Sequence, residues 1–344
     1  MILTYKYRIK DATSRKKLTK LASSVNFVWN YINNLSYKFL KQHNKFLSAF
    51  DIDKYLAGAA SELSLHSTSL QEVSKVYTNN RKTFKKTKLA WRSATRNTLG
   101  WIPFKASAIK MIADDTIKYK NLVLKFYKSR LLPKEASIKT GSFSQDSRGR
   151  WYVNLVVDVQ STTKSNDNAV GIDLGLKDKI ALSNGETFSR ENVSKKFENK
   201  LAAAQRANKK KLVKSVSAKI KNIRKDWTHK ITTQIAKQFA NVYVGDLSST
   251  NILGEAKNIN KSIYDTALYQ IKSFLQYKAV KLGGKCSLIN ESYTTQKCSA
   301  CGTLSGPKGK EELDVREWAC ACGASHNRDT NAAINILRIG HYTP

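Results

Sequence analysis

The chain has 344 residues, of which 41% are hydrophobic, so it can bury a sizeable core and is long enough for two or three domains; this excludes a wholly disordered protein. Sixty Lys and Arg residues against 26 Asp and Glu residues give a formal charge of +34, which a compact protein tolerates poorly unless a polyanion neutralises it, so nucleic acid is the expected partner. No apolar run approaches the ~20 residues that cross a bilayer, and the first ten residues lack the apolar core of a signal peptide. We therefore expect a cytoplasmic protein with no membrane partner.

The N-terminal half begins with a strand and continues with helices. Residues 1–10 alternate between apolar and polar side chains, and apolar residues then recur at helical spacing from Leu18 to Leu35. The stretch 71–105 interleaves basic and aromatic residues, which favours a nucleic-acid surface, although an amphipathic helix with a solvated basic face gives the same pattern. The candidate contacts in this stretch are Arg81, Lys82, Lys85, Lys86, Trp91, Arg92 and Arg96.

From residue 121 the pattern indicates strands. Three runs, 121–127, 137–145 and 151–159, are rich in β-branched and aromatic residues, and Gly149 provides a turn before the last of them. We expect these strands to join the N-terminal strand in a small barrel. The polar run 161–168 then reads as a linker and therefore as a domain boundary.

The C-terminal half has the pattern of an α/β domain. Residues 169–188 form two apolar strands that can pair as a hairpin, and a long helical region with one apolar and one basic face extends to residue 239. Strands at 242–247 and 286–290, separated by a helix at 262–281, precede a final helix. This is the order of an RNase H-like sheet, although order alone is shared by many folds. Candidate nucleic-acid contacts on the basic helix are Lys209, Lys210 and Arg224.

Asp173 ends an apolar strand between Gly171 and Gly175, which places a carboxylate on a rigid element. Two-metal phosphodiester hydrolysis needs several such carboxylates around Mg²⁺ ions about 3.5 to 4 Å apart. A single aspartate on a strand is equally compatible with a turn or capping residue. Asp173 alone therefore does not establish a nuclease.

Four of the five cysteines form a compact cluster in the sequence: Cys298, Cys301, Cys320 and Cys322. Thiolates at this spacing are typical of a tetrahedral structural Zn²⁺ on a ribbon. The second pair is C-x-C rather than C-x-x-C, which tightens the loop and could distort the site. His326 could serve as a substitute ligand or be a solvated loop histidine, and Cys286 is expected as a buried strand residue.

Five parts of the sequence resemble the TnpB family: the N-terminal 35 residues and the segments GIDLGLK (171–177), TTQKCSACG (294–302), WACACG (318–323) and NRDTNAAINIL (327–337). Proteins of this family are encoded with bacterial and archaeal insertion sequences and are related to type V CRISPR effectors. The resemblance implies a β-barrel wedge domain from residues 1–10 and 117–160 and a helical recognition lobe from 11–116. It further implies a RuvC/RNase H-like nuclease domain from 169–292 and 326–344, with a zinc-ribbon insertion at 293–325 that binds target nucleic acid.

The same resemblance assigns Asp173 and Asp329 to the first and last catalytic positions, but Gly245 stands where the family usually has a glutamate. Asp246 could replace that glutamate, although neighbouring strand residues point to opposite faces. Glu291 could instead reach the site from the next strand, roughly 4.8 Å away, and we favour this set of Mg²⁺ ligands. The third alternative is that catalysis is lost.

The resemblance implies an RNA-guided endonuclease, nucleoid-associated in a prokaryote, that uses a guide RNA from the transposon end. It would cleave double-stranded DNA beside a transposon-adjacent motif, and its cofactors would be two catalytic Mg²⁺ ions and a structural Zn²⁺. Arg328, next to Asp329, would hold a phosphate or form a surface salt bridge. The alternatives left open are a nuclease-inactive, repressor-like DNA-binding protein and a transposase that joins DNA ends itself.

Overall fold

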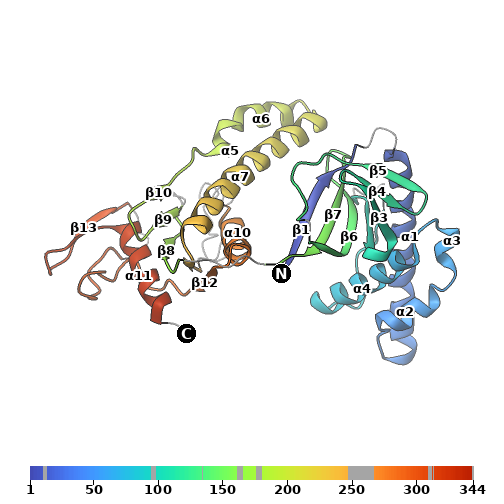
Figure 1. Cartoon of the computed structure of the whole chain (residues 1–344), viewed down its shortest axis with the longest axis horizontal. Coiled ribbons are helices and arrows are strands. Elements are labelled where there is room, and N and C mark those ends of the chain that lie inside the picture. Colours follow the sequence, from blue (N-terminus) through green and yellow to red (C-terminus); the bar gives the residue numbers. More distant parts are fainter. Residues whose placement is uncertain are drawn as a thin grey trace. The chain divides into compact units, whose positions relative to one another are not determined.

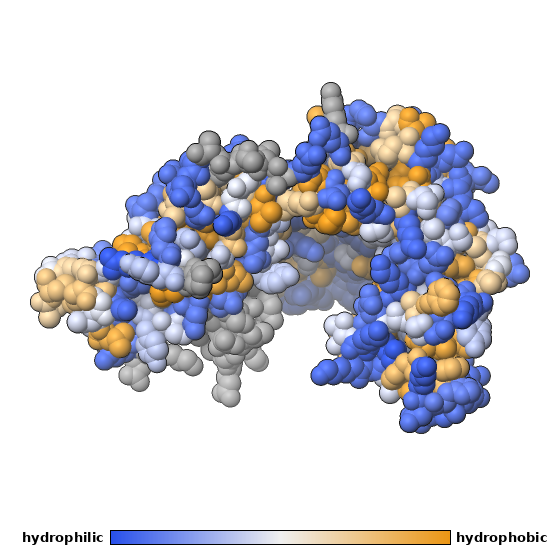
Figure 2. All heavy atoms as spheres, turned by 60° about the horizontal axis from the view of Figure 1, so that its bottom comes forward, coloured by the Kyte–Doolittle hydropathy of each residue, from blue (hydrophilic) through white to orange (hydrophobic). Residues whose placement is uncertain are grey.

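The computed structural model describes residues 1–10, 14–93, 98–133, 135–160, 166–175, 180–246, 267–308, 312 and 314–342. The chain divides into two compact units, Met1–Gln160 and Ser161–Pro344, and the division falls at the start of the polar run expected as a linker. Among the described helices, none combines the length and the apolar character needed to cross a membrane. Hydrophilic residues cover most of the face shown in Figure 2, with hydrophobic patches between them.

The first unit is built on an antiparallel sheet in the order β1-β7-β6-β2, and a second antiparallel sheet has the order β3-β4-β5 (Figure 1). The bridge between Ile9 and Phe126 connects the two. Of the strands expected to join the N-terminal strand in a small barrel, the strand at 151–158 pairs with it directly, whereas the barrel itself stays a prediction. The strands are β1 (Ile2–Arg8), β2 (Trp101–Lys105), β3 (Ile109–Ala113), β4 (Thr116–Tyr119), β5 (Leu122–Lys125), β6 (Ser137–Gln145) and β7 (Trp151–Asp158).

The helices of the first unit bury the apolar faces that their periodicity predicts. In α1 the buried face includes Leu18, Val25, Val28 and Ile32, and α1 and α4 pack against each other and against β2. The described helices are α1 (Arg15–His43), α2 (Ala49–Tyr55), α3 (Ala59–Glu62), α4 (Ser67–Thr83) and the short 3₁₀ helix η2 (Ala106–Ala108).

A helical lobe reaching residue 116 is wrong in its last part, because residues 101–105, 109–113 and 116–119 form strands. Ile102 and Phe104, two residues apart as on one face of a strand, are fully buried, and Pro103 between them is buried as well. β2 is the last strand of its sheet, so Pro103 needs no hydrogen-bonding partner on its open side. The basic and aromatic pattern of the sequence concealed this short period.

The second unit has the α/β architecture expected from the sequence. Its sheet has the order β10-β9-β8-β11-β12; β9 runs antiparallel to both β8 and β10, and β11 runs parallel to β8 and β12. The strands are β8 (Ala169–Asp173), β9 (Ile180–Leu182), β10 (Thr187–Phe188), β11 (Asn241–Gly245) and β12 (Lys285–Ile289). The predicted hairpin and both later strands are confirmed to within a few residues.

Helices cover both faces of this sheet. Val170, Ile172, Val242 and Val244 point to one face and share a core with α7 and α10. Helix α11 lies against β8, β9, β11 and β12 (Figure 1). The helices are α5 (Val193–Lys196), α6 (Glu198–Arg206), α7 (Lys210–Gln238), α10 (Leu268–Lys281) and α11 (Arg328–Tyr342). The part of the predicted helix 262–281 before residue 267 lies outside the described residues.

A two-stranded ribbon of β13 (Glu317–Ala319) and β14 (Ser325–Asn327) precedes α11 directly. Cys320 and Cys322 lie in the turn between these strands, and Cys298 and Cys301 in the loop after β12. The strand pair therefore leads from the cysteine cluster to the residue that begins α11.

Candidate active site and cysteine cluster

Asp173 and Asp329 come together because β8 and α11 approach each other closely at Gly171. A Cβ atom added at Gly171 would collide with the backbone of Ala333 and Leu337, so only glycine permits this packing. Asp173 follows Gly171 by two residues and faces the same side of the strand, while Asp329 lies about one helical turn before Ala333. Asp329 is 8% exposed at the start of α11. The sheet and the helix thus carry these two carboxylates near enough for the charge of Asp329 to act on Asp173.

Gly245 ends β11 on the side that faces α11, and its missing side chain leaves a space that Glu291 enters. A Cβ atom at position 245 would collide with Oε2 of Glu291 and would lie 3.1 Å from Cδ1 of Ile336 on α11. Parallel pairing aligns Gly245 with Ile289, two residues before Glu291. The carboxylate of Glu291 therefore occupies the position from which a side chain at 245 would extend.

Asp246 points elsewhere. Its carboxylate accepts a hydrogen bond from Nζ of Lys272 on α10 at 2.6 Å and is about half exposed. Neighbouring strand residues alternate between faces, and α10 packs on the face opposite to that of Gly245. The geometry therefore disfavours Asp246 as the missing acid.

Asp173 and Glu291 both have raised pKa values. Burial, followed by the charges of Glu291 and Asp329, raises the pKa of Asp173 to about 8. Burial also raises the pKa of Glu291 to about 7, and the ammonium group of Lys272 opposes this rise. Oε2 of Glu291 is buried and has no hydrogen-bonding partner among the described residues. By accessible surface Asp173 and Glu291 are half-buried and Asp329 is buried, and their carboxylate oxygens do not form a group within 4.8 Å of one another. The unsatisfied oxygen and the raised pKa values of two neighbouring acids are the features that a divalent cation would compensate.

Arg316, which sequence reasoning missed, pairs with Asp329. Its Nη1 donates to both carboxylate oxygens of Asp329, each at 3.0 Å. Because an acid left buried without its partner is costly, Arg316→Met should lower the free energy of unfolding by about 2 kcal/mol in the absence of divalent cations. Urea unfolding measures this, and Lys128→Met is the control, because its ion pair with Asp114 is largely exposed and should contribute under about 0.5 kcal/mol. Equal losses in the two variants would contradict this role of Arg316.

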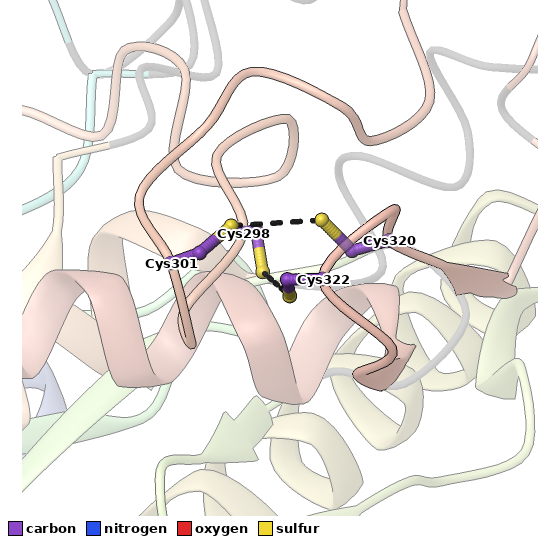
Figure 3. A group of neighbouring side chains, drawn as sticks. All are labelled: Cys298, Cys301, Cys320 and Cys322. Atoms are coloured by element: carbon purple, nitrogen blue, oxygen red, sulfur yellow. Dashed lines mark hydrogen bonds between the residues drawn. The ribbon is translucent and has the colours of Figure 1, made fainter.

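The four cysteine sulfurs converge (Figure 3). Sγ of Cys298 lies 3.8 Å from Sγ of Cys322, and Sγ of Cys301 lies 3.6 Å from Sγ of Cys320. Tetrahedral Zn²⁺ with Zn–S bonds of about 2.3 Å requires S–S separations of roughly 3.8 Å. Of the described residues, these four make up the group of potential ligands whose ligand atoms all lie within 4.8 Å of one another. The cluster could hold a metal ion, and the C-x-C spacing does not prevent its convergence.

His326 contacts this cluster without completing it. Its Nε2 lies 3.0 Å from Sγ of Cys298, but the histidine does not belong to the mutually close group. Its ring also packs against Trp318, with ring centroids 4.6 Å apart. The arrangement resembles a hydrogen bond to one thiolate more than a replacement for a cysteine ligand.

Two asparagines on α11 hold the loop that carries the first cysteine pair. Asn331 and Asn335, one helical turn apart, both donate to the carbonyl oxygens of Thr294 and Lys297 at 2.7 to 3.2 Å. Oδ1 of Asn331 also accepts from the backbone N–H of Ser299 at 2.8 Å. The same helix thus positions Asp329 and the cysteine loop. The spacing of two asparagines on one helix face was the available sequence signal.

Two expected nucleic-acid contacts are wrong because their side chains are buried. Arg81 is 6% exposed, and its guanidinium stacks on the ring of Phe46 at 3.5 Å. Arg328 is 8% exposed and donates to the carbonyl oxygen of Glu312 at 2.7 Å, so it is neither a surface ion pair nor free to hold a phosphate. Sequence reasoning placed both on the surface because they are charged.

The remaining candidates differ in accessibility. Arg92 is bound to Asn26 and Arg224 to Ser194, and Arg96 lies outside the described residues. The side chains that are exposed are those of Lys82, Lys85, Lys86, Trp91, Lys209 and Lys210.

Comparison with known proteins gives two adjoining family matches. Residues 152–254 match the model for OrfB_IS605, a probable transposase, and residues 269–336 match the Cas12f1-like TNB domain. A putative RNA-guided DNA endonuclease of Streptomyces pristinaespiralis is 37% identical over 62% of this chain and 55% of its own length. The putative RNA-guided DNA endonuclease InsQ of Escherichia coli K12 is 30% identical over 59% of this chain and 57% of its own.

The chain therefore spans little more than half the length of the curated relatives that it matches. The fold is similar to that of the Cas12f1 protein in a Cas12f1-sgRNA-target DNA complex, with a TM-score of 0.64 and 15% identity over 94% of this chain and 82% of that one. The family matches include the segments that carry GIDLGLK and both cysteine pairs. Over residues 152–254 and 269–336 the chain is therefore similar to the OrfB_IS605 probable transposases and to the Cas12f1-like TNB domain, in agreement with its resemblance to the TnpB family.

Proposed function

We propose that this protein is an RNA-guided endonuclease that cleaves double-stranded DNA through a RuvC-like, metal-dependent site. The observation that supports this most is the position of the Glu291 carboxylate in the space beside Gly245, on the sheet face that also carries Asp173 and meets Asp329 on α11. Two relatives that are 37% and 30% identical to parts of this chain are named putative RNA-guided DNA endonucleases. A site that had lost its function would have no need for a relocated acid.

Asp173, Glu291 and Asp329 would hold two Mg²⁺ ions, which supply an activated water and stabilise the leaving oxygen of the phosphodiester. Asp173 sits on a strand end and Asp329 on a helix start, so both are fixed before substrate arrives. In the absence of cations, the guanidinium of Arg316 compensates the charge of Asp329. When a cation binds, Arg316 must either release the Asp329 carboxylate or share its oxygens with the cation. The cysteine cluster, as a structural Zn²⁺ site, would fix the loop that Asn331 and Asn335 hold.

The partners in this proposal are a guide RNA derived from the transposon end and the target DNA duplex. Base pairing would read the target sequence, whereas the protein would contact phosphates and a short flanking motif. Many lysines on and beside α7 are exposed and suit the backbone of a nucleic acid, among them Lys209, Lys210, Lys211, Lys214, Lys219 and Lys221.

Changing two of these lysines tests their contact with phosphates. The variant Lys209→Ala/Lys210→Ala should weaken binding of double-stranded DNA and reduce the slope of log K against log salt by about 1 to 2. Fluorescence anisotropy from low to moderate salt measures the slope. The control Lys54→Ala/Lys128→Ala removes the same number of positive charges, but from lysines that are already paired with Asp51 and Asp114. An equal loss of salt slope in this control would mean that only the net charge of the protein matters.

The function itself is tested by co-expressing the chain with its flanking DNA and sequencing the RNA that copurifies. The complex should cleave a DNA target that matches this RNA when Mg²⁺ is present, and should leave a scrambled target intact. Guided binding without cleavage would favour the nuclease-inactive, repressor-like alternative. Failure to retain any specific RNA would contradict both readings and would favour a transposase that acts on DNA ends alone.

A further inference from the structure

Helix α1 carries three asparagines on one face, at positions 26, 30 and 33. Each reaches the segment Leu89–Arg92, which belongs to no described helix or strand. Asn33 accepts from the backbone N–H of Leu89 at 3.0 Å and donates to its carbonyl oxygen at 2.7 Å. Asn30 makes the same pair of bonds with Arg92, both at 2.8 Å. Two side-chain amides thus pair with the segment as the backbone of a neighbouring strand would.

Two further contacts complete the attachment. Asn26 accepts from Nε of Arg92 at 2.9 Å, and the indole N–H of Trp29 donates to the carbonyl oxygen of Ala90 at 3.2 Å. Asn33 and Trp29 are themselves buried. The segment is therefore held along the helix by six hydrogen bonds from a rigid element, and the backbone on both sides of Trp91 is fixed.

The side chain of Trp91 is not buried by this arrangement. It is 54% exposed, whereas the other five tryptophans are buried or half-buried. A large apolar side chain that stays exposed loses the free energy it would gain by burial. Because the backbone around Trp91 is fixed, the indole cannot move to a buried position. A structural role does not require the indole to face solvent, but a binding role does.

The surroundings of Trp91 suit a nucleic acid. Between residues 82 and 92 there are five basic residues and no acidic one. Nζ of Lys88 lies 5.8 Å from the Trp91 ring and 4.9 Å from the ring of Tyr37 on α1. Phosphates would be attracted by the charges, and an indole beside them offers a flat surface to a base.

We propose that Trp91 is a fixed platform on which one nucleobase of the bound nucleic acid stacks. The asparagines of α1 set its position, and the lysines around it hold the adjoining phosphates. This inference rests on the nucleic-acid binding in the proposed function, but not on cleavage. The base could come from the guide RNA or from the target DNA, since both present the same aromatic face.

The test uses the full chain, freed of copurifying RNA, with two probes that carry 2-aminopurine: a single-stranded RNA and a DNA duplex with an unpaired end. Trp91→Ala should weaken binding of at least one probe about 10-fold and remove its fluorescence quenching, while the salt slope stays unchanged, because stacking displaces no counterion. Trp91→Phe should retain binding within about 3-fold. Phe50→Ala, which removes another highly exposed aromatic ring on α2, should bind like the wild type.

A loss confined to the RNA probe assigns the base to the guide, and a loss confined to the DNA probe assigns it to the target. Asn30→Ala/Asn33→Ala, if circular dichroism shows it folded, should lose quenching although Trp91 is still present. Wild-type affinity of Trp91→Ala for both probes would overturn the platform, as would a loss that Phe50→Ala reproduces. Absence of cleavage by the wild type would refute the proposed nuclease without affecting this result.

Discussion

Glu291→Gln is expected to reduce guided DNA cleavage by about 10³-fold, equivalent to roughly 4 kcal/mol of lost transition-state stabilisation, because the amide removes the charge that completes the cation site. Asp246→Asn should stay within a few-fold of wild type, because its carboxylate is paired with Lys272 on the other side of the strand. The measurement is single-turnover cleavage at saturating Mg²⁺ by complexes that bind target equally well. Equal defects in the two variants would mean that Glu291 has no special place in the site.

Moving the acid back to the strand sharpens this comparison. Gly245→Glu alone should be inactive and less stable, because the new side chain would collide with Glu291 and Ile336 and would add a fourth acid to the site. Gly245→Glu/Glu291→Gly removes the collision and restores one carboxylate to the same space, so it should recover part of the activity. A double variant that remains folded but is no more active than Gly245→Glu would contradict the idea that the two positions share one site.

Loss of a cysteine ligand is expected to have the largest effect on stability. Structural Zn²⁺ contributes about 10 kcal/mol or more to the folding of small zinc domains, so Cys298→Ser should lose bound zinc and release the loop that Asn331 and Asn335 hold. Zinc content by mass spectrometry and protection of residues 293–327 from hydrogen exchange measure this. Cys286→Ser is the control, because Cys286 lies on β12 away from the cluster. Retention of zinc and protection in Cys298→Ser would refute the assignment.

The sequence was sufficient for features that a short motif encodes. Asp173 at a strand end, the four cysteines and the order of strands and helices in the second unit could all be read from local patterns. The proximity of Glu291 to Gly245 followed from one tertiary step, the pairing of neighbouring strands. That pairing is present in register, whereas the role of Glu291 as a metal ligand stays a prediction.

The features that sequence reasoning missed depend on contacts between distant residues. Arg316 gives no local sign that it will meet Asp329, and the asparagines of α1 and α11 look like ordinary polar helix residues until their backbone partners are known. Positive charge alone also led to wrong predictions: Arg81 is buried with its guanidinium stacked on the ring of Phe46, and Arg328 is buried with a hydrogen bond to a carbonyl oxygen. A positive charge in the sequence predicts a partner, but the fold decides which one.

The most direct test of the proposed site is to locate the catalytic cations in the guided complex. A crystal of the RNA- and DNA-bound protein in Mn²⁺, recorded at the manganese absorption edge, should show anomalous density in contact with the carboxylates of Asp173, Glu291 and Asp329. The same crystal of Glu291→Gln should lose at least one of these peaks. Density that contacts Asp173 and Asp329 but leaves Glu291 more than a coordination distance away would contradict the account.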